Sequence, residues 1–231
     1  QQGSLDAEVS EVVYDSRKAG PGAVFICMKG TRRDSHDFIP QVTEAGVRVL
    51  VTEHPVEVSS QVTVIVVGNG REALARLSAA RFGNPSRKLL MIGVTGTKGK
   101  TTTTHMVKTI LEAAGKKTGM IGTNGVMIGT DHYPTVNTTP ESYDLHRYFA
   151  QMTEAGCECC VMEVSSQAMK MHRVTGIVFD CAVFTNISPD HIGPDEHADF
   201  AEYLFYKKQL FTQSRRAFVN LDDEHFQEII K

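Results

Sequence analysis

Short runs of consecutive apolar residues recur along the chain, separated by stretches in which apolar residues are spaced by three or four positions. The runs, several of them rich in β-branched residues, predict buried strands at 23–28, 47–52, 62–67, 89–94, 117–122, 159–164, 181–185 and 217–220. The spaced stretches predict helices at 38–45, 71–82, 101–114 and 141–155. Because strands alternate with helices, we expect an α/β fold whose sheets are mostly parallel.

A cluster of turn-forming residues divides this pattern into two parts. Gly68, Asn69 and Gly70 interrupt the chain after the third predicted strand, and we place a domain boundary there. Residues 1–69 are expected to form a small N-terminal α/β domain. Residues 70–231 are expected to form a second domain, which contains the larger series of strands and helices.

The strand predicted at 89–94 runs into the segment TGTKGKTTT (95–103) and then into a helical pattern. Glycine lets the backbone approach an anion closely, and the N-terminus of a helix presents N–H groups to it. Lys100 would reach outer phosphates, and the Thr101 hydroxyl would bind Mg²⁺. Val94 stands where the strict phosphate-loop pattern has its first glycine, and an ordinary strand–turn–helix connection is the alternative interpretation. The residues expected to bind nucleotide are Gly96, Thr97, Lys98, Gly99, Lys100, Thr101 and Thr102.

Polar residues also follow other predicted strands. Glu163 lies in the run CCVMEV, and His191 follows CAVFTN by a few residues. In open α/β sheets, ligands bind beyond the carboxyl ends of the strands, so we expect these side chains to converge on the phosphate loop. Carboxylate oxygen suits Mg²⁺ and imidazole is acceptable in a mixed site, which makes Thr101, Glu163 and His191 the candidate metal ligands. A surface acid and a structural histidine are the alternatives.

Composition excludes several classes of protein. The chain has 231 residues, 41% hydrophobic and 22% charged, with a net charge of −3, which is typical of a globular protein without a basic surplus for nucleic acid. No apolar run approaches the roughly 18 residues that span a bilayer. The five cysteines are an odd number and suggest reduced thiols in a cytoplasm. The cluster CECC (157–160) lacks a second Cys/His pair at zinc-finger spacing, so small buried hydrophobes are favoured over a metal site.

The order of the motifs resembles the Mur ligase family, and within it the MurE type. TGTKGKTTT is followed by NTTPE (137–141), EVSSQ (163–167), HRV (172–174) and FTNISPDH (184–191). Upstream, DSR (15–17) and PGAVFICMKGTRRDSHDFI (21–39) resemble the uridine-binding N-terminal domain of that type. The resemblance covers nearly the whole chain, and it implies a small UDP-binding domain followed by a phosphate-loop ATPase domain with a mostly parallel sheet.

The family uses ATP to join an amino acid to the peptide carboxylate of a UDP-sugar-peptide. The resemblance therefore implies a ligase of peptidoglycan synthesis that adds lysine or diaminopimelate to UDP-MurNAc-L-Ala-D-Glu through an acyl phosphate. It implies ATP and Mg²⁺ as cofactors, with Thr101 on a first metal ion and Glu163 and His191 on a second. The implied partners are the UDP-N-acetylmuramoyl dipeptide and a free amino acid, with no nucleic acid and no membrane. The full-length protein is expected to be a cytoplasmic monomer.

The family also uses a lysine that CO₂ has carbamylated. The segment YLFYKKQLF (203–211) matches the family pattern in the register that gives this role to Lys207 and not to Lys208; a plain surface lysine is the alternative. The implied catalytic residues are Lys100, Lys207, Glu163 and His191. The implied uridine-diphosphate contacts are Tyr14, Ser16, Thr31, Arg32 and Arg33. The implied sugar–peptide contacts are Asn137, Thr138, Thr139, Ser165 and Arg173, although residues 137–139 could also be a mere turn before a helix.

The chain departs from the family pattern in several places. Lys98 replaces an asparagine of the loop, and two extra residues lie between His191 and His197. Family members carry a C-terminal domain that binds the incoming amino acid, so a chain that ends at Lys231 is expected to be a fragment without that pocket. Two other hypotheses stay open. One is a related folylpolyglutamate or cyanophycin synthetase, which residues 14–39 disfavour, and the other is a non-catalytic module that binds nucleotide or UDP-sugar.

Overall fold

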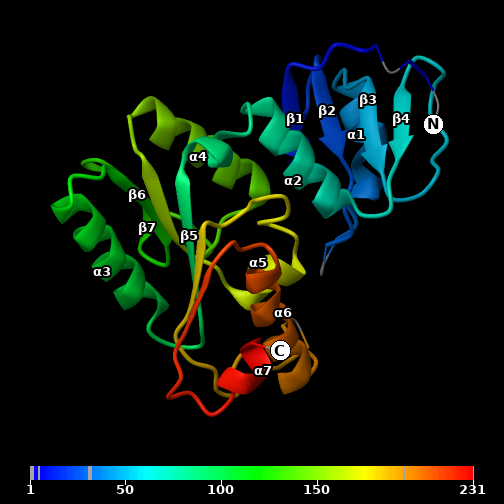
Figure 1. Ribbon diagram of the computed structural model, residues 1–231. Coiled ribbons are helices and arrows are strands. Elements are labelled where there is room, and N and C mark those ends of the chain that lie inside the picture. The colour runs from blue at the N-terminus through cyan, green and yellow to red at the C-terminus, as the bar shows by residue number, and fades with distance from the viewer. Residues whose placement is uncertain (1–2, 5, 31–32, 195, 231) are drawn as a thin grey trace. The chain divides into compact units, whose positions relative to one another are not determined.

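The computed structural model describes residues 3–4, 6–30, 33–194 and 196–230 of the chain, which folds into two compact units, residues 1–81 and 82–231. Each unit has a sheet of its own (Figure 1). Helix α2 (Gly70–Arg81) groups with the first unit, whereas the sequence analysis assigns it to the second domain. Compactness does not by itself say where functional domains divide, so the boundary after residue 69 stays a prediction.

The first unit is a four-stranded parallel sheet in the order β1-β2-β3-β4. Its elements besides α2 are β1 (Glu11–Val13), η1 (Ser16–Lys18), β2 (Ala23–Ile26), η2 (Ser35–Phe38), α1 (Ile39–Glu44), β3 (Val49–Thr52) and β4 (Thr63–Val66). Side chains of a strand alternate between the two faces of a sheet. Phe25 and Leu50 therefore share one face, where they form a buried core with Ile39 and Val42 of α1.

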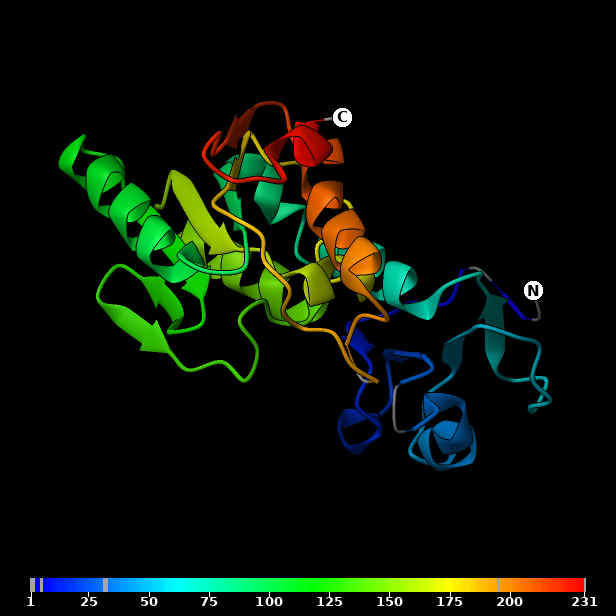
Figure 2. The same ribbon diagram turned by 90° about the horizontal axis from the view of Figure 1, so that it is seen from below.

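The second unit contains a seven-stranded sheet in the order β11-β10-β5-β9-β6-β7-β8. Its strands are β5 (Leu90–Thr95), β6 (Thr118–Gly122), β7 (Gly125–Ile128), β8 (Asp131–Tyr133), β9 (Cys159–Glu163), β10 (Cys181–Phe184) and β11 (Ala217–Val219). The strands from β11 to β6 in this order pair in parallel, and β7 and β8 add an antiparallel hairpin. Figure 2 shows the hairpin, in green, on the opposite side of the unit from the red C-terminal segment.

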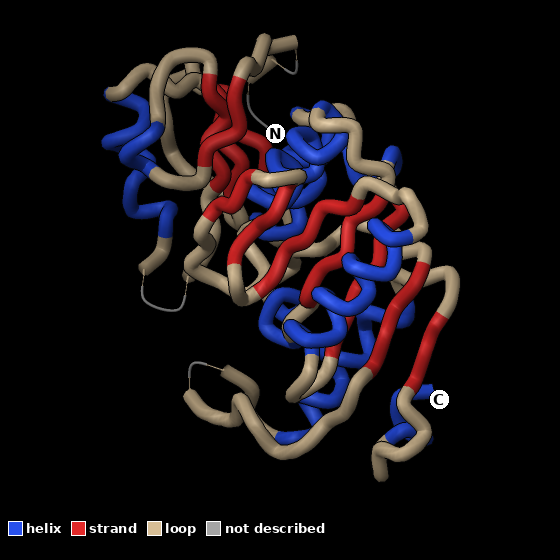
Figure 3. The backbone as a smooth tube through the Cα atoms, turned by 90° about the vertical axis from the view of Figure 1, so that its left-hand side faces the viewer, coloured by secondary structure: helices blue, strands red, loops and turns tan. Residues whose placement is uncertain are grey.

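Helices cover both faces of the larger sheet (Figure 3). They are η3 (Pro85–Lys88), α3 (Lys100–Ala113), α4 (Ser142–Glu154), α5 (Ser166–Lys170), α6 (Phe200–Thr212) and α7 (Phe226–Ile230). On one face, Val107 and Leu111 of α3 pack against Val94 and Val161 of the sheet. On the other, Phe149 of α4 and Leu210 of α6 belong to the main core. No helix among the described residues is long and apolar enough to cross a membrane.

The strands and helices predicted from the pattern are all present, with ends that differ by a few residues, and the mostly parallel α/β fold is confirmed. The pattern did not predict β1, the β7–β8 hairpin or helices α5, α6 and α7. The first three are strands of three or four residues, too short for a clear alternation. Helix α6 does have a start signal, because the Asp199 side chain accepts a hydrogen bond from the Glu202 N–H.

Candidate active site

The phosphate-loop segment connects β5 to α3 and requires glycine at two positions. Gly96 has a φ of +149°, and a Cβ built there would lie 1.9 Å from Thr185 Oγ1. Gly99, with a φ of +82°, precedes the first residue of α3, and no side chain caps the helix. Because the first N–H groups of a helix have no acceptor within the helix, they are available to an anion.

The end of β10 holds this loop in place. β10 pairs in parallel with β5, so that Thr185 and Asn186, which follow β10, lie beside the loop. Asn186 accepts hydrogen bonds from the Thr97 N–H through its backbone oxygen (2.8 Å) and from the Lys98 N–H through its side chain (2.9 Å). The Thr185 hydroxyl donates to the Lys98 carbonyl at 2.8 Å. The loop is therefore fixed by protein contacts before any ligand binds.

Two lysines that lie far apart in the sequence donate to one backbone oxygen of this loop. Lys100 Nζ lies 2.8 Å from the Gly96 carbonyl oxygen, and Lys207 Nζ from α6 lies 2.7 Å from the same atom. Lys100 also donates to the Thr97 carbonyl at 3.1 Å. The Lys207 ammonium nitrogen lies 4.5 Å from the centre of the Tyr203 ring, and the residue is only 1% exposed.

The surroundings of Lys207 and Lys100 shift the pKa values of their amines by different causes. Burial, followed by the positive charge of Lys100, lowers the pKa of Lys207 well below its ordinary value, and Asp190 opposes the shift. Burial also lowers the pKa of Lys100, but Glu163 and Asp190 act to raise it. Lys100 is therefore the better placed of the two to keep its proton, whereas Lys207 is driven toward the neutral amine.

The Glu163 carboxylate lies at the end of β9, which is the other parallel neighbour of β5. Glu163 is only 1% exposed to solvent. Oε1 accepts hydrogen bonds from the Thr101 hydroxyl and from the Thr123 N–H, both at 2.9 Å, and Oε2 accepts from the Thr123 hydroxyl at 3.3 Å. The predicted metal ligands Thr101 and Glu163 are thus brought into direct contact beside the N-terminus of α3.

Carboxylate and hydroxyl oxygen are the donors that Mg²⁺ prefers, so the chemistry of this pair fits the ion. The described residues contain no group of three or more His, Cys, Asp or Glu side chains placed to hold a metal. The five cysteines are free thiols, of which Cys181 is half-buried and the others buried.

His191, the other predicted ligand, lies in the loop between β10 and α6. Its side chain is 51% exposed and its Nδ1 contacts the Glu196 carboxylate at 2.8 Å. Its φ of +54° is uncommon for a residue other than glycine, and such conformations cluster at functional sites. No described contact joins His191 to Glu163 or Thr101, so its role as a metal ligand stays a prediction.

Most of the residues expected to bind the sugar–peptide group gather around Glu163. The Thr139 hydroxyl donates to the Glu163 backbone oxygen (2.9 Å) and accepts from the Ser165 N–H (3.2 Å), and the Thr138 and Thr123 hydroxyls lie 3.1 Å apart. Asn137 is exposed. These contacts make the segment around residue 139 more than a mere turn, because it is tied to the end of β9.

Arg173 is held by two oxygens. Its Nε donates to the Glu141 carboxylate at 2.6 Å and its Nη1 to the Thr139 carbonyl at 3.0 Å. A substrate carboxylate or phosphate would have to share this guanidinium with Glu141, so the predicted substrate contact stays a prediction.

The first unit has a hollow of about 580 Å³ that unites three of the predicted uridine-diphosphate contacts, Tyr14, Ser16 and Arg33. The other residues that line it are Asp15, Arg17, Ser35, Phe38 and Gln41. The remaining predicted contacts, Thr31 and Arg32, lie outside the described residues. The hollow combines aromatic surface with guanidinium groups, which suits a base attached to phosphates.

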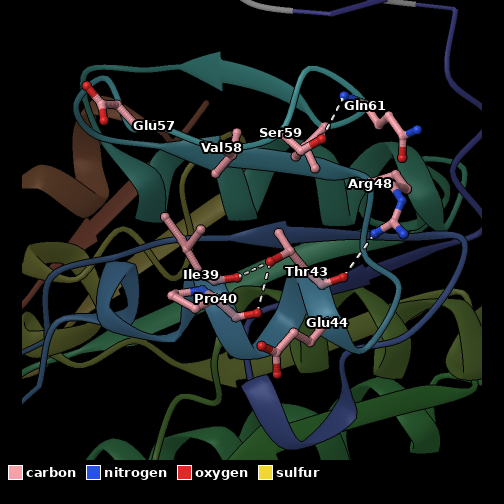
Figure 4. A pocket seen from close by; sticks show the side chains of 10 residues that line it. Ile39, Pro40, Thr43, Glu44, Arg48, Glu57, Val58, Ser59 and Gln61 are labelled. Atoms are coloured by element: carbon pink, nitrogen blue, oxygen red, sulfur yellow. Dashed lines mark hydrogen bonds between the residues drawn. The ribbon is translucent and has the colours of Figure 1, made fainter.

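A second hollow of the first unit, of about 380 Å³, lies between α1 and residues 57–62 (Figure 4). It contains none of the predicted site residues. Its one arginine, Arg48, donates to the carbonyls of Thr43 and Val47 at 2.9 and 3.0 Å. Because that guanidinium already binds the end of α1, this hollow is a poorer candidate for an anionic ligand.

Sequence reasoning missed three contributors to the site. The Gly96 carbonyl, Thr123 and Tyr203 hold the candidate catalytic side chains in place, yet none carries a charge. Thr123 could have been found, since it follows a predicted strand directly, as Glu163 and the phosphate loop do. A backbone carbonyl leaves no signal in the sequence beyond the glycine itself.

Comparison with known families accounts for this arrangement. Residues 94–231 match the Mur ligase middle domain, and residues 8–82 match the catalytic domain of the Mur ligase family. The chain belongs to the Mur ligase family. The resemblance inferred from TGTKGKTTT, EVSSQ and FTNISPDH is thereby confirmed.

Individual members give the same result. Over 230 residues, the chain is 44% identical to the UDP-N-acetylmuramoyl-L-alanyl-D-glutamate–2,6-diaminopimelate ligase of Clostridium perfringens, covering 100% of this chain and 47% of that protein. A solved structure of an enzyme of that name has a TM-score of 0.83 at 24% identity, covering 98% of this chain and 47% of the other. The MurF ligase of Thermotoga maritima in complex with ADP has a TM-score of 0.62 at 21% identity, covering 97% and 49%. The chain therefore spans about half the length of the Mur ligases it matches.

Proposed function

We propose that the full-length protein containing this chain is an ATP-dependent ligase that adds diaminopimelate to UDP-MurNAc-L-Ala-D-Glu in peptidoglycan synthesis. The observation that carries the proposal is the joint placement of Lys100, Lys207 and the Thr101–Glu163 pair around one phosphate loop. The name of the Clostridium perfringens relative supports the choice of diaminopimelate over lysine. The substrate carboxylate would attack the γ-phosphate of ATP, giving an acyl phosphate and ADP, and the incoming amine would then displace phosphate.

The residues of the loop supply what phosphoryl transfer needs, which is positioning and charge neutralisation. The N–H groups at the start of α3 would receive the phosphates of ATP. Lys100 would leave the Gly96 carbonyl to follow the charge that develops on the γ-phosphate. A first Mg²⁺ ion held by Thr101 and a second held by Glu163 and His191 would neutralise the phosphate oxygens, and the Thr101–Glu163 hydrogen bond would place the two sites side by side.

The state of Lys207 supports its assignment as the carbamylated lysine. A carbamate forms when a neutral amine attacks CO₂: the nitrogen lone pair bonds to carbon, one C=O electron pair moves to oxygen, and the nitrogen loses a proton. An ordinary lysine is almost wholly protonated at neutral pH. At Lys207, burial and the Lys100 charge lower the pKa, so much more of the amine is reactive. The carbamate would add an anion close to the phosphate loop.

The UDP part of the substrate would bind the hollow lined by Tyr14, Ser16 and Arg33. Arg33 suits the diphosphate and an aromatic ring suits the base. We also propose that the protein works in the cytoplasm, which agrees with its free thiols and with ATP as a substrate.

Phosphate release by the full-length protein tests this function. The assay contains ATP, Mg²⁺ and UDP-MurNAc-L-Ala-D-Glu, with diaminopimelate, lysine or other amines added one at a time. Release that depends on diaminopimelate is expected. Turnover with a folate would instead favour the folylpolyglutamate-type reading. Tight binding of ATP and UDP-sugar without phosphate release under any condition would support the hypothesis of a non-catalytic binding module.

A further inference from the structure

The shared acceptor of Lys100 and Lys207 gives the phosphate-loop lysine a role before ATP binds. Both side chains donate to the Gly96 carbonyl oxygen, at 2.8 and 2.7 Å, so the two nitrogens lie close together in the ligand-free protein. Two ammonium groups on one oxygen repel each other, and the deeper one is only 1% exposed to water that could screen it. The arrangement is therefore unfavourable for as long as Lys207 is protonated.

The acceptor cannot move aside to relieve this repulsion. Gly96 adopts a positive φ, and its Cα lies so close to the Thr185 side chain that an added Cβ would overlap Thr185 Oγ1. Thr185 is itself tied by its N–H to the Thr95 carbonyl at 3.0 Å. The Tyr203 ring lies against the Lys207 nitrogen, and its hydroxyl is hydrogen-bonded to Thr97 Oγ1 at 3.1 Å. The two amines are thus confined together.

We propose that Lys100 promotes the carbamylation of Lys207, because its positive charge disfavours the ammonium form of that neighbour and stabilises the carbamate that replaces it. The inference rests on the carbamylation of Lys207 proposed above. Carbamylation changes the charge at the Lys207 nitrogen from +1 to −1, and a cation on the same carbonyl favours both halves of that change. Among the described side chains, Lys100 lowers the pKa of Lys207 and Asp190 raises it, and Lys207 in turn lowers the pKa of His197.

The proposal implies an order of events. Lys100 first promotes the carbamylation of Lys207, while both side chains contact Gly96. It contacts the phosphates of ATP afterwards. The face of the Tyr203 ring attracts a cation and repels an anion. Without Lys100, the carbamate would be a buried anion against this ring face, and the ammonium group that stabilises it would be missing. Lys100 is thus a positioning and activating residue for Lys207, in addition to its expected contact with phosphate.

The test is the occupancy of the carbamate in the nucleotide-free chain, measured by carbon-13 NMR during a titration with labelled bicarbonate at fixed pH. Lys207→Met identifies the signal, since it must abolish it. Lys100→Gln removes the charge and is expected to raise the CO₂ concentration for half-occupancy by about tenfold or more. Lys100→Arg keeps the charge and is expected to stay within about threefold of wild type. Lys108→Gln removes a cation two turns along the same helix and should have no effect.

The possible outcomes separate the inference from the function on which it rests. Equal bicarbonate titrations for wild type and Lys100→Gln overturn the role of Lys100 and leave the carbamate intact. A wild-type protein without any signal that Lys207→Met removes overturns the carbamate itself, and the inference with it. Glutamine at position 100 can still donate a hydrogen bond to the Gly96 carbonyl, whereas methionine cannot. Lys100→Met, with circular dichroism to check folding, should therefore show at least the loss seen in Lys100→Gln. A loss in Lys100→Arg as large as in Lys100→Gln would assign the effect to shape and reject the role of charge.

Discussion

The Thr101 hydroxyl donates a 2.9 Å hydrogen bond to the Glu163 carboxylate, which joins the first turn of α3 to the end of β9. The two residues are 62 positions apart in the chain and meet because β5 and β9 are parallel neighbours that end at the same edge. The Thr123 N–H completes the contact from the end of β6, which pairs with the other side of β9. A buried carboxylate thereby lies beside the N-terminus of α3, where we propose that the phosphates and their metal ion bind.

Glu163→Gln should lower kcat of the full-length ligase on the order of a hundredfold, because the side chain keeps its size but loses the charge that Mg²⁺ requires. Steady-state phosphate release measures this, together with the Mg²⁺ concentration for half-maximal rate, which should rise. Asp131→Asn, an exposed carboxylate of β8, is the control and should behave as wild type. An unchanged Mg²⁺ dependence in Glu163→Gln would remove Glu163 from the metal site.

Lys207→Ala should abolish most activity, since it removes both the amine and the carbamate derived from it. Short carboxylates such as formate or acetate should restore part of the rate, because they can place an anion in the space that the side chain leaves. The neighbour Lys208 is half-buried, and Lys208→Ala is the matched control, with activity expected near that of wild type. Full activity in Lys207→Ala, or equal losses in both variants, would contradict the assignment.

Much of the site could be predicted because its residues follow apolar runs directly. Glu163 lies near the end of one such run and the phosphate loop follows another, and parallel pairing brings both to one edge. The match of YLFYKKQLF to the family pattern implies Lys207 as the carbamylated residue, which stays a prediction, and the structure buries Lys207 while Lys208 is half-buried.

Other features depend on three-dimensional contacts that no local pattern encodes. The Gly96 carbonyl becomes an acceptor for two lysines only when α6 packs beside the loop. The β7–β8 hairpin consists of short strands whose pairing is set by the turn between them. His146 stands between Leu145 and Arg147 in α4 and would ordinarily be assigned to a polar face, yet it is 1% exposed. Packing overrides the preference of each residue in these places.

Arg33→Ala should raise KM for the UDP-linked substrate by about tenfold, with a smaller change in kcat, because a charge-assisted hydrogen bond to the diphosphate is lost far from the reacting carboxylate. Binding of the UDP-linked substrate by calorimetry would check the same loss without catalysis. Arg48→Ala is the control: it is an exposed arginine of the same unit that lines the other hollow. Equal effects of the two substitutions would point to general charge and would count against the hollow around Tyr14.

The free energy of unfolding should fall as the pH is lowered from about 6.5 to about 4, and His146 should account for up to about 3 kcal/mol of that fall. Burial lowers its pKa from 6.5 to about 4, and neither ring nitrogen has a hydrogen-bond partner within the part of the chain that the structure describes. In this window the unfolded chain binds a proton that the folded chain rejects, so acid favours unfolding; below about pH 4 both states are protonated and the contribution stops growing.

Urea unfolding, followed by circular dichroism because the sequence has no tryptophan, would measure this between pH 4 and 7. His146→Leu should flatten the dependence, whereas Leu145→Ala, a buried neighbour without a titrating group, should lower stability equally at every pH. Parallel curves for wild type and His146→Leu would show that the pH dependence arises elsewhere.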